Sequence, residues 1–389
     1  MLLLVWVLCG NFLRAGDASS PAPRSDRGIT YTNDRIDSAP WSVHVVKASR
    51  TDPTLEIRST LARGTILGLS TVSEQARSIP AEIGTPLAGV NGDFYEREGS
   101  QYAGDPRGLL IVDGELVSGP TGNPNYCAFW IDADGSPHTG NVTSQFKATL
   151  ADGRSFPIGL NEDRRSIGVV LFTPAFGRAT HASGGRELIL EREGDGPWLP
   201  LRAGETYKAR VRSVSNAGNT RLEKDHMVLS FGARVSTSAP IDSGAVITLS
   251  TATTPELRGA KVAIGGGSVI TRAGKRTKIP ESSGAPSGNS YRTSAMFERH
   301  PRAAVGWSKS HIFLVEVDGR QRGLSVGMTL EELGEYMAKI GCEEAINLDG
   351  GGSATFWYRG RVVSSPSDGT ERAVANGLLV IRKPQTGPR

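Results

Sequence analysis

Two short segments combine an amide and a carboxylate at a spacing that suits catalysis. Asn91 and Asp93 lie two residues apart where one β-patterned run ends, and Asn347 and Asp349 do so where another ends. Residues two apart in a strand project to the same side. Two such pairs facing one cleft would form a carboxylate pair for acid–base or nucleophilic cleavage of a glycosidic bond. The alternative, two aspartates in ordinary turns, carries about equal weight from these residues alone.

A run of three glycines and a serine, residues 350–353, follows Asp349 directly. Its backbone can approach a ligand closely and direct N–H groups at phosphate or sugar oxygens. It lacks the lysine of a Walker loop. The alternative is a tight turn in which only glycine fits.

Three arginines are candidates for binding phosphate, because a guanidinium matches two oxygens at once. Arg302 follows Pro301 and is the first candidate, ahead of Arg372 and then Arg107. The alternative for each is a surface ion pair. Beside the catalytic candidates Asp349, Asp93 and Arg302, the expected substrate-binding residues are Asn91, Gly92, Asn347, Gly350, Gly351, Gly352, Ser353, Arg372 and Arg107.

Composition and charge narrow the function classes. The chain has 389 residues and a formal charge of +4, with lysine and arginine spread along its length. No nucleic-acid motif is visible, so a nucleic-acid partner is not expected. The six histidines, His44 and His181 among them, show no spacing of metal ligands, which argues against a metal-dependent phosphodiesterase.

The chain divides into five expected parts. An apolar N-terminal run followed by small residues predicts a signal peptide and an exported protein, periplasmic or secreted, although the usual basic residues at its start are missing. No apolar run is long enough for a stable membrane span. The expected parts are a signal peptide (1–18), a linker (19–28), an N-terminal catalytic part (29–122), a β-rich insertion (123–260) and a C-terminal catalytic part (261–385).

The expected fold is α+β, with mixed or antiparallel sheets and few helices, because 48 glycines and 22 prolines indicate many turns. One helix is predicted from Ser73 to Ile79. The clearest helix begins after Thr329, with Glu332 completing a capping box, and Gly341 ends it. This helix lies between the predicted strands 311–317 and 345–348, which indicates a strand–helix–strand unit.

Local residue pairs suggest turns and one cysteine pairing. Asp134–Gly135, Asp152–Gly153 and Asp318–Gly319 are typical of hairpin turns, and we expect no function for the last of them. Cys127 and Cys342 either pair in an oxidising compartment or remain free.

Five segments appear in the order seen in the phosphodiester glycosidase family, which the chain resembles from about Ile29 to Arg382. The family includes N-acetylglucosamine-1-phosphodiester α-N-acetylglucosaminidase. Asn-Leu-Asp-Gly-Gly-Gly-Ser is the most specific part of the resemblance. The segments are Ala88–Tyr95, His300–Gly306, Val317–Arg320, Asn347–Phe356 and Pro366–Arg372.

The resemblance implies a hydrolase that cleaves the anomeric C–O bond of a sugar-1-phosphate diester and releases sugar and a phosphomonoester. Asp349 would be the nucleophile or electrostatic stabiliser, Asp93 its acid–base partner, and Arg302 the phosphate clamp. Asn91, Asn347 and the glycine run would orient the sugar. The roles of the two aspartates are interchangeable at this stage.

The chain departs from the animal members of that family, because it lacks their cysteine-rich region and C-terminal membrane span. This indicates a soluble bacterial member acting on a cell-wall or capsular sugar phosphate. The alternative is a non-catalytic protein that binds such a polymer, but aromatic residues make up only 6% of the chain, which favours catalysis. We expect no required cofactor, with a calcium ion (Ca2+) near the glycine run left open. The sugar, the alcohol and the anomeric outcome also remain open.

Overall fold

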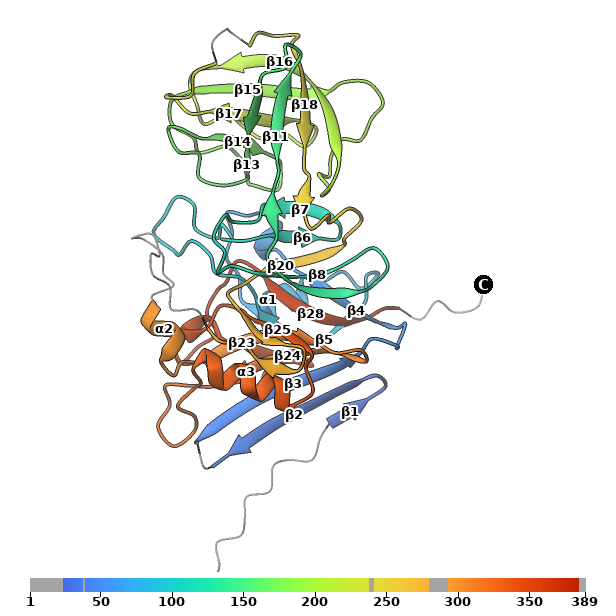
Figure 1. Cartoon of the computed structure of the whole chain (residues 1–389), viewed down its shortest axis with the longest axis vertical. Coiled ribbons are helices and arrows are strands. Elements are labelled where there is room, and N and C mark those ends of the chain that lie inside the picture. The colour runs from blue at the N-terminus through green and yellow to red at the C-terminus, as the bar shows by residue number, and fades with distance from the viewer. Residues whose placement is uncertain (1–23, 38, 238–240, 280–292, 385–389) are drawn as a thin grey trace, which may run out of the picture.

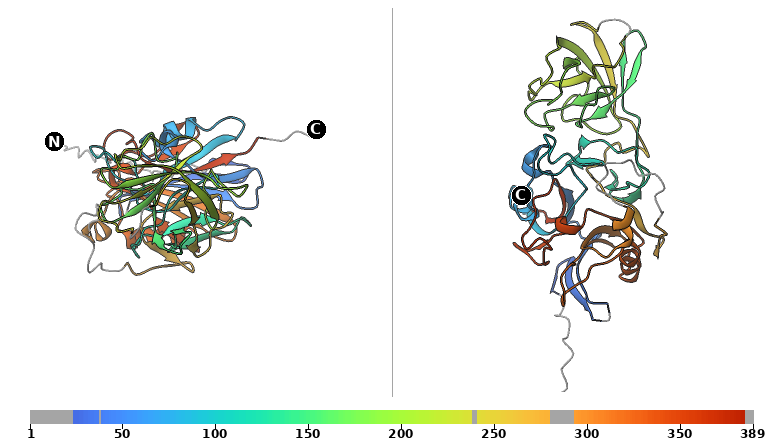
Figure 2. Two further views of the ribbon diagram at one scale, coloured as in Figure 1. Left: turned by 90° about the horizontal axis from the view of Figure 1, so that it is seen from above. Right: turned by 90° about the vertical axis from the view of Figure 1, so that its left-hand side faces the viewer.

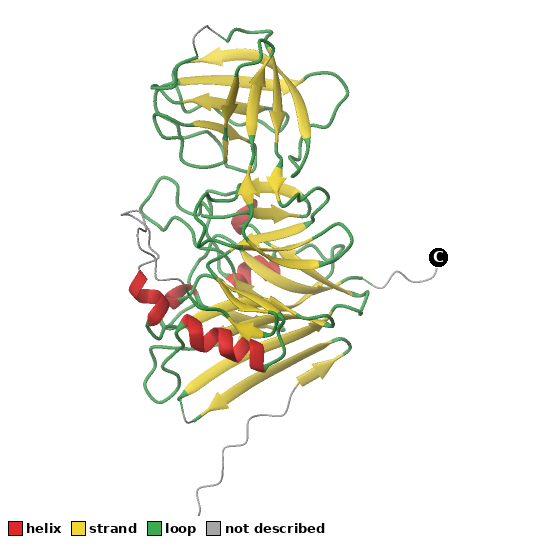
Figure 3. Cartoon of the chain, in the orientation of Figure 1, coloured by secondary structure: helices red, strands yellow, loops and turns green. Residues whose placement is uncertain are grey.

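The computed structural model describes residues 24–37, 39–237, 241–279 and 293–384, so the predicted signal peptide lies outside the described residues. Strands contain 41% of the residues and helices 7%, so the protein is mostly β. The predicted α+β class is wrong. Figure 3 shows the few helices as short covers on a body of strands.

An eight-stranded sheet, here called the main sheet, forms one end of the elongated molecule (Figure 1). Val43 and Val45 face one side, where they pack with α3 (Leu330–Lys339), and Val46 and Ala48 face the other. This alternation is the two-residue period of a strand buried on both faces. In sheet order the strands are β1 (Arg24–Asp26), β2 (Ile29–Ile36), β3 (Trp41–Ser49), β24 (His311–Val317), β23 (Arg302–Trp307), β25 (Glu344–Asn347), β21 (Val269–Arg272) and β22 (Lys275–Arg276).

A five-stranded sheet, the facing sheet, packs on the second side of the main sheet. Val90 and Leu378 from the facing sheet share one core cluster with Val46 and Leu314 from the main sheet. The short helix α1 (Val72–Arg77) covers the outer side. The strands are β27 (Arg361–Val362), β26 (Phe356–Tyr358), β5 (Thr85–Asn91), β28 (Gly377–Arg382) and β4 (Leu55–Ser59).

Residues 147–250 build a separate eight-stranded sheet, the distal sheet, at the far end of the molecule (Figures 1 and 2). A two-stranded ribbon and a five-stranded connecting sheet lie between it and the rest. The limits of the predicted insertion, 123–260, stay a prediction. The distal sheet has β12 (Ser155–Pro157), β11 (Lys147–Leu150), β18 (Val246–Ser250), β16 (Thr206–Ser215), β15 (Arg186–Arg192), β17 (Met227–Phe231), β14 (Val169–Phe172) and β13 (Gly159–Leu160). The ribbon has β10 (Thr143–Ser144) and β19 (Thr253–Thr254), and the connecting sheet has β7 (Glu115–Ser118), β6 (Leu110–Val112), β20 (Val262–Gly265), β8 (Ala128–Ile131) and β9 (Pro137–Gly140).

The helices α1 and α3 each begin with a complete capping box. α3 (Leu330–Lys339) begins after Thr329, whose side chain accepts a hydrogen bond from the Glu332 amide, as predicted. α1 begins after Thr71 rather than at Ser73, because Thr71 and Glu74 form a capping box there. The remaining helical segments are α2 (Thr293–Phe297) and the 3-10 turns η1 (Ala62–Gly64) and η2 (Gly351–Ser353).

The predicted strand–helix–strand unit is not the organising element of the fold. β24 and β25 do not pair with each other, because β23 lies between them and pairs antiparallel with both. The helix α3 is therefore an isolated cover on a β architecture, which explains why the α+β prediction failed.

Two of the three predicted hairpin turns are confirmed. Asp134–Gly135 joins β8 to β9, and Asp152–Gly153 joins β11 to β12. Asp318 is instead buried at the end of β24, with its side chain bonded across the sheet, so that prediction is wrong. Cys127 and Cys342 are both free.

Candidate active site

The first predicted motif lies where β5 leaves the facing sheet. The main-chain N–H of Asp93 donates to Asn376 Oδ1 at 2.8 Å, and the N–H of Gly92 donates to the Asn376 carbonyl at 3.0 Å. Asn376 directly precedes β28, the neighbour of β5. Its side chain therefore extends the strand pairing by one residue and fixes the position of Asp93.

The second motif reaches the first from the main sheet. Asp349 follows β25, and its main-chain N–H donates to the Gly92 carbonyl at 2.9 Å. Asn91 Nδ2 donates to the Asp349 carbonyl at 2.7 Å, and Asn91 Oδ1 accepts from the Thr355 N–H at 3.1 Å. The structure thus brings the two motifs together, with the Asn91 amide fastening them rather than facing a sugar. Asn347 is buried within β25.

Asp93 carries the more strongly perturbed carboxyl group of the pair. Its side chain is 2% exposed, and its oxygens accept main-chain hydrogen bonds from Phe94 and Gly108, each at 2.7 Å. Burial raises the pKa of Asp93 to about 7, and the charge of Asp349 adds to the rise against the opposing hydrogen bonds. A carboxyl group of this kind exchanges its proton near neutral pH, as acid–base catalysis requires.

A glycine of the connecting sheet packs directly on Asp93. A Cβ at Gly265 would lie 2.6 Å from Asp93 Oδ2, closer than any side chain can sit. Gly108 approaches from another segment, with its hypothetical Cβ at 3.0 Å from the same oxygen. Two glycines, Gly108 from a nearby segment and Gly265 from a distant one, therefore enclose this carboxylate.

Asp349 is the more accessible member of the pair. Burial raises its pKa above the ordinary range, while hydrogen bonds from Ser353 and Gly350 and the charges of Arg97 and Arg372 oppose the rise. Its Oδ1 accepts the Gly350 N–H at 2.9 Å. Part of its charge is thus already held by the turn that follows it.

The glycine run forms a tight turn against Arg372. Gly351 has φ 63°, a conformation that glycine adopts without strain, and it begins η2. Arg372 donates to Ser353 Oγ at 3.3 Å and from Nε to Asp368 at 3.0 Å. A Cβ at Gly352 would overlap the Arg372 guanidinium. The predicted residues 350–353 and Arg372 therefore lie together beside Asp349.

The Arg302 side chain donates hydrogen bonds to main-chain carbonyls beside α2 and α3. Its Nε donates to the Met328 carbonyl at 2.8 Å, and its Nη2 donates to the carbonyls of Ala295 and Glu298 at 2.5 and 2.8 Å. The side chain is 5% exposed and joins the ends of α2 and α3. This placement favours a structural role, and the predicted phosphate clamp finds no support in it.

Arg107 connects the pair to a large pocket. Its charge lowers the Asp93 pKa, and it donates to Glu96 at 3.1 Å. It also lines a pocket of about 1360 Å3 between the segment 96–126 and the distal sheet. Neither Asp93 nor Asp349 lines that pocket, which therefore lies beside the carboxylates and does not contain them.

Four further residues belong to the site by position. Tyr95 is buried, its hydroxyl donates to the Ala373 carbonyl at 3.0 Å, and burial with the Asp349 charge raises its pKa. Asn376 Nδ2 is buried without a hydrogen-bond partner among the described residues. Tyr95 and Arg320 lie within segments that resemble the family, so that resemblance could have predicted them. Arg97 and Asn376 lie outside the five segments of the resemblance and were not predicted. The four are Tyr95, Arg97, Arg320 and Asn376.

The protein is mostly β, and its candidate site couples the buried carboxyl group of Asp93 electrostatically to that of Asp349. The sequence model of the phosphodiester glycosidase family matches residues 204–381, which include Asp349 and Arg372 but not Asp93. This match confirms the resemblance at the level of the family.

The curated relatives match over short segments. An uncharacterized SPbeta prophage-derived protein of Bacillus subtilis, YomE, is 37% identical over 83 residues, 21% of this chain and 13% of its own. N-acetylglucosamine-1-phosphodiester α-N-acetylglucosaminidase of Bos taurus is 47% identical over 70 residues, 17% of this chain and 12% of its own. The matched part is thus about an eighth of each relative.

Solved structures share the fold over most of the chain. A hypothetical protein from Synechocystis superposes with TM-score 0.72 at 19% identity, covering 94% of this chain and 65% of its own. A protein of Burkholderia pseudomallei K96243, named as a candidate exported protein, gives TM-score 0.65 at 22% identity over 88% and 74% of the two chains. Among the described residues, no helix is long and apolar enough to cross a membrane.

Proposed function

We propose that this chain is an exported hydrolase that cleaves the anomeric C–O bond of a sugar-1-phosphate diester. The observation that carries the proposal is Asp93, a buried carboxyl group with a pKa of about 7 beside the second carboxyl group of Asp349. Paired carboxyl groups whose environments differ are the usual means of glycoside hydrolysis. The family match supports this reaction class.

The two carboxyl groups take different parts in the reaction. Water adds to C1 of the sugar, the bond from C1 to the phosphate oxygen breaks, and its electron pair leaves with the phosphomonoester. Asp93 accepts the proton of the water, and the more accessible Asp349 stabilises the positive charge at C1. The leaving phosphate is already acidic, so the reaction depends less on a proton donor than on charge stabilisation.

Arg372 takes the phosphate-binding role that the sequence suggested for Arg302. Arg372 donates a hydrogen bond to Ser353, and its charge lowers the pKa of Asp349. An arginine at this position can bind two phosphate oxygens. Arg320 lies on the other side of the turn, where a Cβ at Gly351 would be 3.1 Å from its guanidinium. The buried Nδ2 of Asn376 is suited to donate to a sugar hydroxyl.

The pocket beside Arg107 supports a substrate larger than a single sugar. Its walls combine Tyr126 and Phe146 with the charged side chains of Arg165 and Asp163. Such a mixed lining suits the remainder of a phosphate-containing glycan, for which a bacterial cell wall or capsule is one source. The structural similarity to a candidate exported protein supports export.

The test uses UDP-GlcNAc and a panel of sugar-1-phosphate methyl diesters in oxygen-18 water. Wild type is compared with Asp349→Asn and with Asp195→Asn, which changes an exposed loop aspartate outside the site. We expect wild type and the Asp195 variant to release sugar labelled at C1. The rate of hydrolysis should fall by roughly 100-fold or more in the Asp349 variant. Label in the phosphate would replace the proposal with a phosphodiesterase. Tight binding without turnover would indicate a binding protein.

A further inference from the structure

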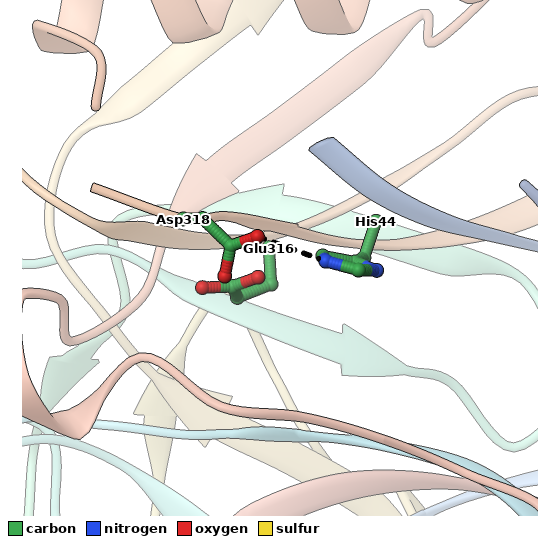
Figure 4. A group of neighbouring side chains, drawn as sticks. All are labelled: His44, Glu316 and Asp318. Atoms are coloured by element: carbon green, nitrogen blue, oxygen red, sulfur yellow. Dashed lines mark hydrogen bonds and ion pairs between the residues drawn. The ribbon is translucent and has the colours of Figure 1, made fainter. Parts of the chain in front are cut away.

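A second polar cluster lies between the main and facing sheets, apart from the carboxylate pair. His44 of β3 is paired in register with Glu316 of β24, and Asp318 follows two residues later. Directly opposed residues and residues two apart in a strand project to one face. Figure 4 shows the three side chains converging in one space. On this face His44 also stacks on Phe356 of the facing sheet, with ring centroids 6.2 Å apart.

The three side chains have the burial and spacing of metal ligands. His44, Glu316 and Asp318 are 2%, 1% and 1% exposed. One ligand atom from each lies within 4.8 Å of the others, and His44 Nε2 is 3.1 Å from Asp318 Oδ2. Atoms that coordinate one ion at about 2.0–2.2 Å must lie within twice that distance of each other, so small side-chain adjustments would suffice.

Glu316 gives an independent indication of a ligand. Its Oε2 is buried and has no hydrogen-bond partner among the described residues. A buried carboxylate oxygen without a partner costs several kcal/mol on the general scale for such groups, and protein structures rarely retain one. A cation between Glu316 and Asp318 would satisfy this oxygen.

Neighbouring groups hold the other two side chains in position. The Tyr31 hydroxyl bonds His44 Nδ1 at 2.8 Å, which leaves Nε2 directed at Asp318. Ser42 Oγ donates to Asp318 Oδ2 at 2.6 Å, and the Ser365 N–H donates to Oδ1 at 2.5 Å. Metal-binding histidines and carboxylates characteristically have such supporting bonds.

We propose that His44, Glu316 and Asp318 bind one divalent transition-metal ion of the zinc type. One imidazole nitrogen with two carboxylates suits zinc or manganese, whereas calcium prefers oxygen ligands alone. The ion braces the end of β24, from which the chain continues to Arg320 beside the glycine turn. The cluster lies on β3 and at the end of β24, whereas Asp93 and Asp349 follow β5 and β25, and the metal proposal does not depend on the proposed hydrolysis.

The test measures metal binding by the full chain. Protein stripped with a chelator is titrated with Zn2+, Mn2+ and Ca2+ by calorimetry, and its thermal midpoint is recorded with and without each ion. Wild type is compared with Glu316→Gln, which keeps the side-chain shape. The matched control is Asp132→Asn, since Asp132 forms a partly exposed ion pair with His138 at 2.7 Å, far from the buried cluster in the sequence.

We expect about one Zn2+ or Mn2+ per wild-type chain, a higher thermal midpoint with the ion, and weak or no response to Ca2+. Glu316→Gln should bind about 100-fold more weakly or worse, and Asp132→Asn should match wild type. If circular dichroism shows that Glu316→Gln does not fold, Tyr31→Phe replaces it, with an expected loss of about 10- to 100-fold. Wild type that binds neither ion at one equivalent, or a folded variant at Glu316 or Tyr31 that binds as tightly as wild type, overturns the proposal.

Discussion

The main-chain N–H of Asp349 donates a hydrogen bond to the carbonyl oxygen of Gly92 over 2.9 Å. The bond joins the end of β25 in the main sheet to the end of β5 in the facing sheet. It places the Asp349 carboxyl group close enough to raise the pKa of Asp93 by its charge. The site is therefore a property of the junction between two sheets.

The coupling predicts that Asp349→Asn lowers the pKa of Asp93. Removing a nearby negative charge makes ionisation of the buried carboxyl group easier, although burial still keeps its pKa above the ordinary value. Carbon-13 NMR of the aspartate carboxyl groups across pH measures the change. An Asp93 titration that is identical in the two proteins contradicts the coupling.

Protein stability should depend on pH through Asp93. With a pKa raised from 3.8 to about 7, native Asp93 holds its proton between these values while the unfolded chain has lost it. This contribution to stability is therefore complete below about pH 4 and is lost as pH rises through 7, by about 4 kcal/mol at most. Urea unfolding at pH 4.5 and pH 8 should show a smaller decrease for Asp93→Asn than for wild type. Equal decreases would show that Asp93 titrates normally.

Gly265→Ala should impair the site by displacing the Asp93 carboxylate. The new Cβ would lie 2.6 Å from Asp93 Oδ2, so the carboxylate or β20 must move. Gly196→Ala is the control, because a Cβ there meets nothing within 4 Å and the backbone needs no positive φ. We expect a loss of at least 10-fold in kcat/KM for Gly265→Ala alone, measured on the diester substrates. Equal kinetics in both variants would exclude the close approach.

Lysine variants of Arg302 and Arg372 should differ, the first in protein stability and the second in kinetics. Arg302→Lys breaks bonds to main-chain carbonyls and should lower the free energy of unfolding by about 1–3 kcal/mol. Arg372→Lys removes the two-pronged phosphate contact that we propose, and it should raise KM or lower kcat with little change in stability, since the Arg372–Asp368 ion pair is partly exposed. Urea unfolding and steady-state kinetics on both variants distinguish a structural arginine from a phosphate-binding one. The reverse pattern would restore Arg302 as the phosphate clamp.

The cap of α3 should contribute measurably to folding. Thr329 accepts from the Glu332 N–H at 3.1 Å, and Thr329→Ala leaves that amide without its partner. The expected loss is about 1 kcal/mol in the free energy of unfolding. Thr329→Ser, which keeps the capping hydroxyl, serves as the control, and a loss equal to that of Thr329→Ala would argue against the capping box.

Much of the candidate site could be predicted because its residues follow strands directly. The positions of Asp93 and Asp349 at strand ends, and of the glycine run beyond, depend on local sequence patterns. The side-chain direction of Arg302 could not be predicted, since its partners at Met328 and Ala295 come from other elements. Asp318–Gly319 has the composition of a turn, but the aspartate is buried, and Ser42 and Ser365 donate hydrogen bonds to its carboxylate.

The local features could be predicted from the amino-acid sequence: the capped start of α3, the hairpin turns at Gly135 and Gly153, and the motif residues around Asp93 and Asp349. Each depends on neighbours a few residues away, through capping, turn conformation and alternation. The three-dimensional fold was needed to show that β23 separates β24 from β25, that the protein is mostly β, and that His44 lies beside Glu316. These outcomes depend on pairing between strands that are distant in the sequence. Local sequence patterns do not specify which strands pair or in which register.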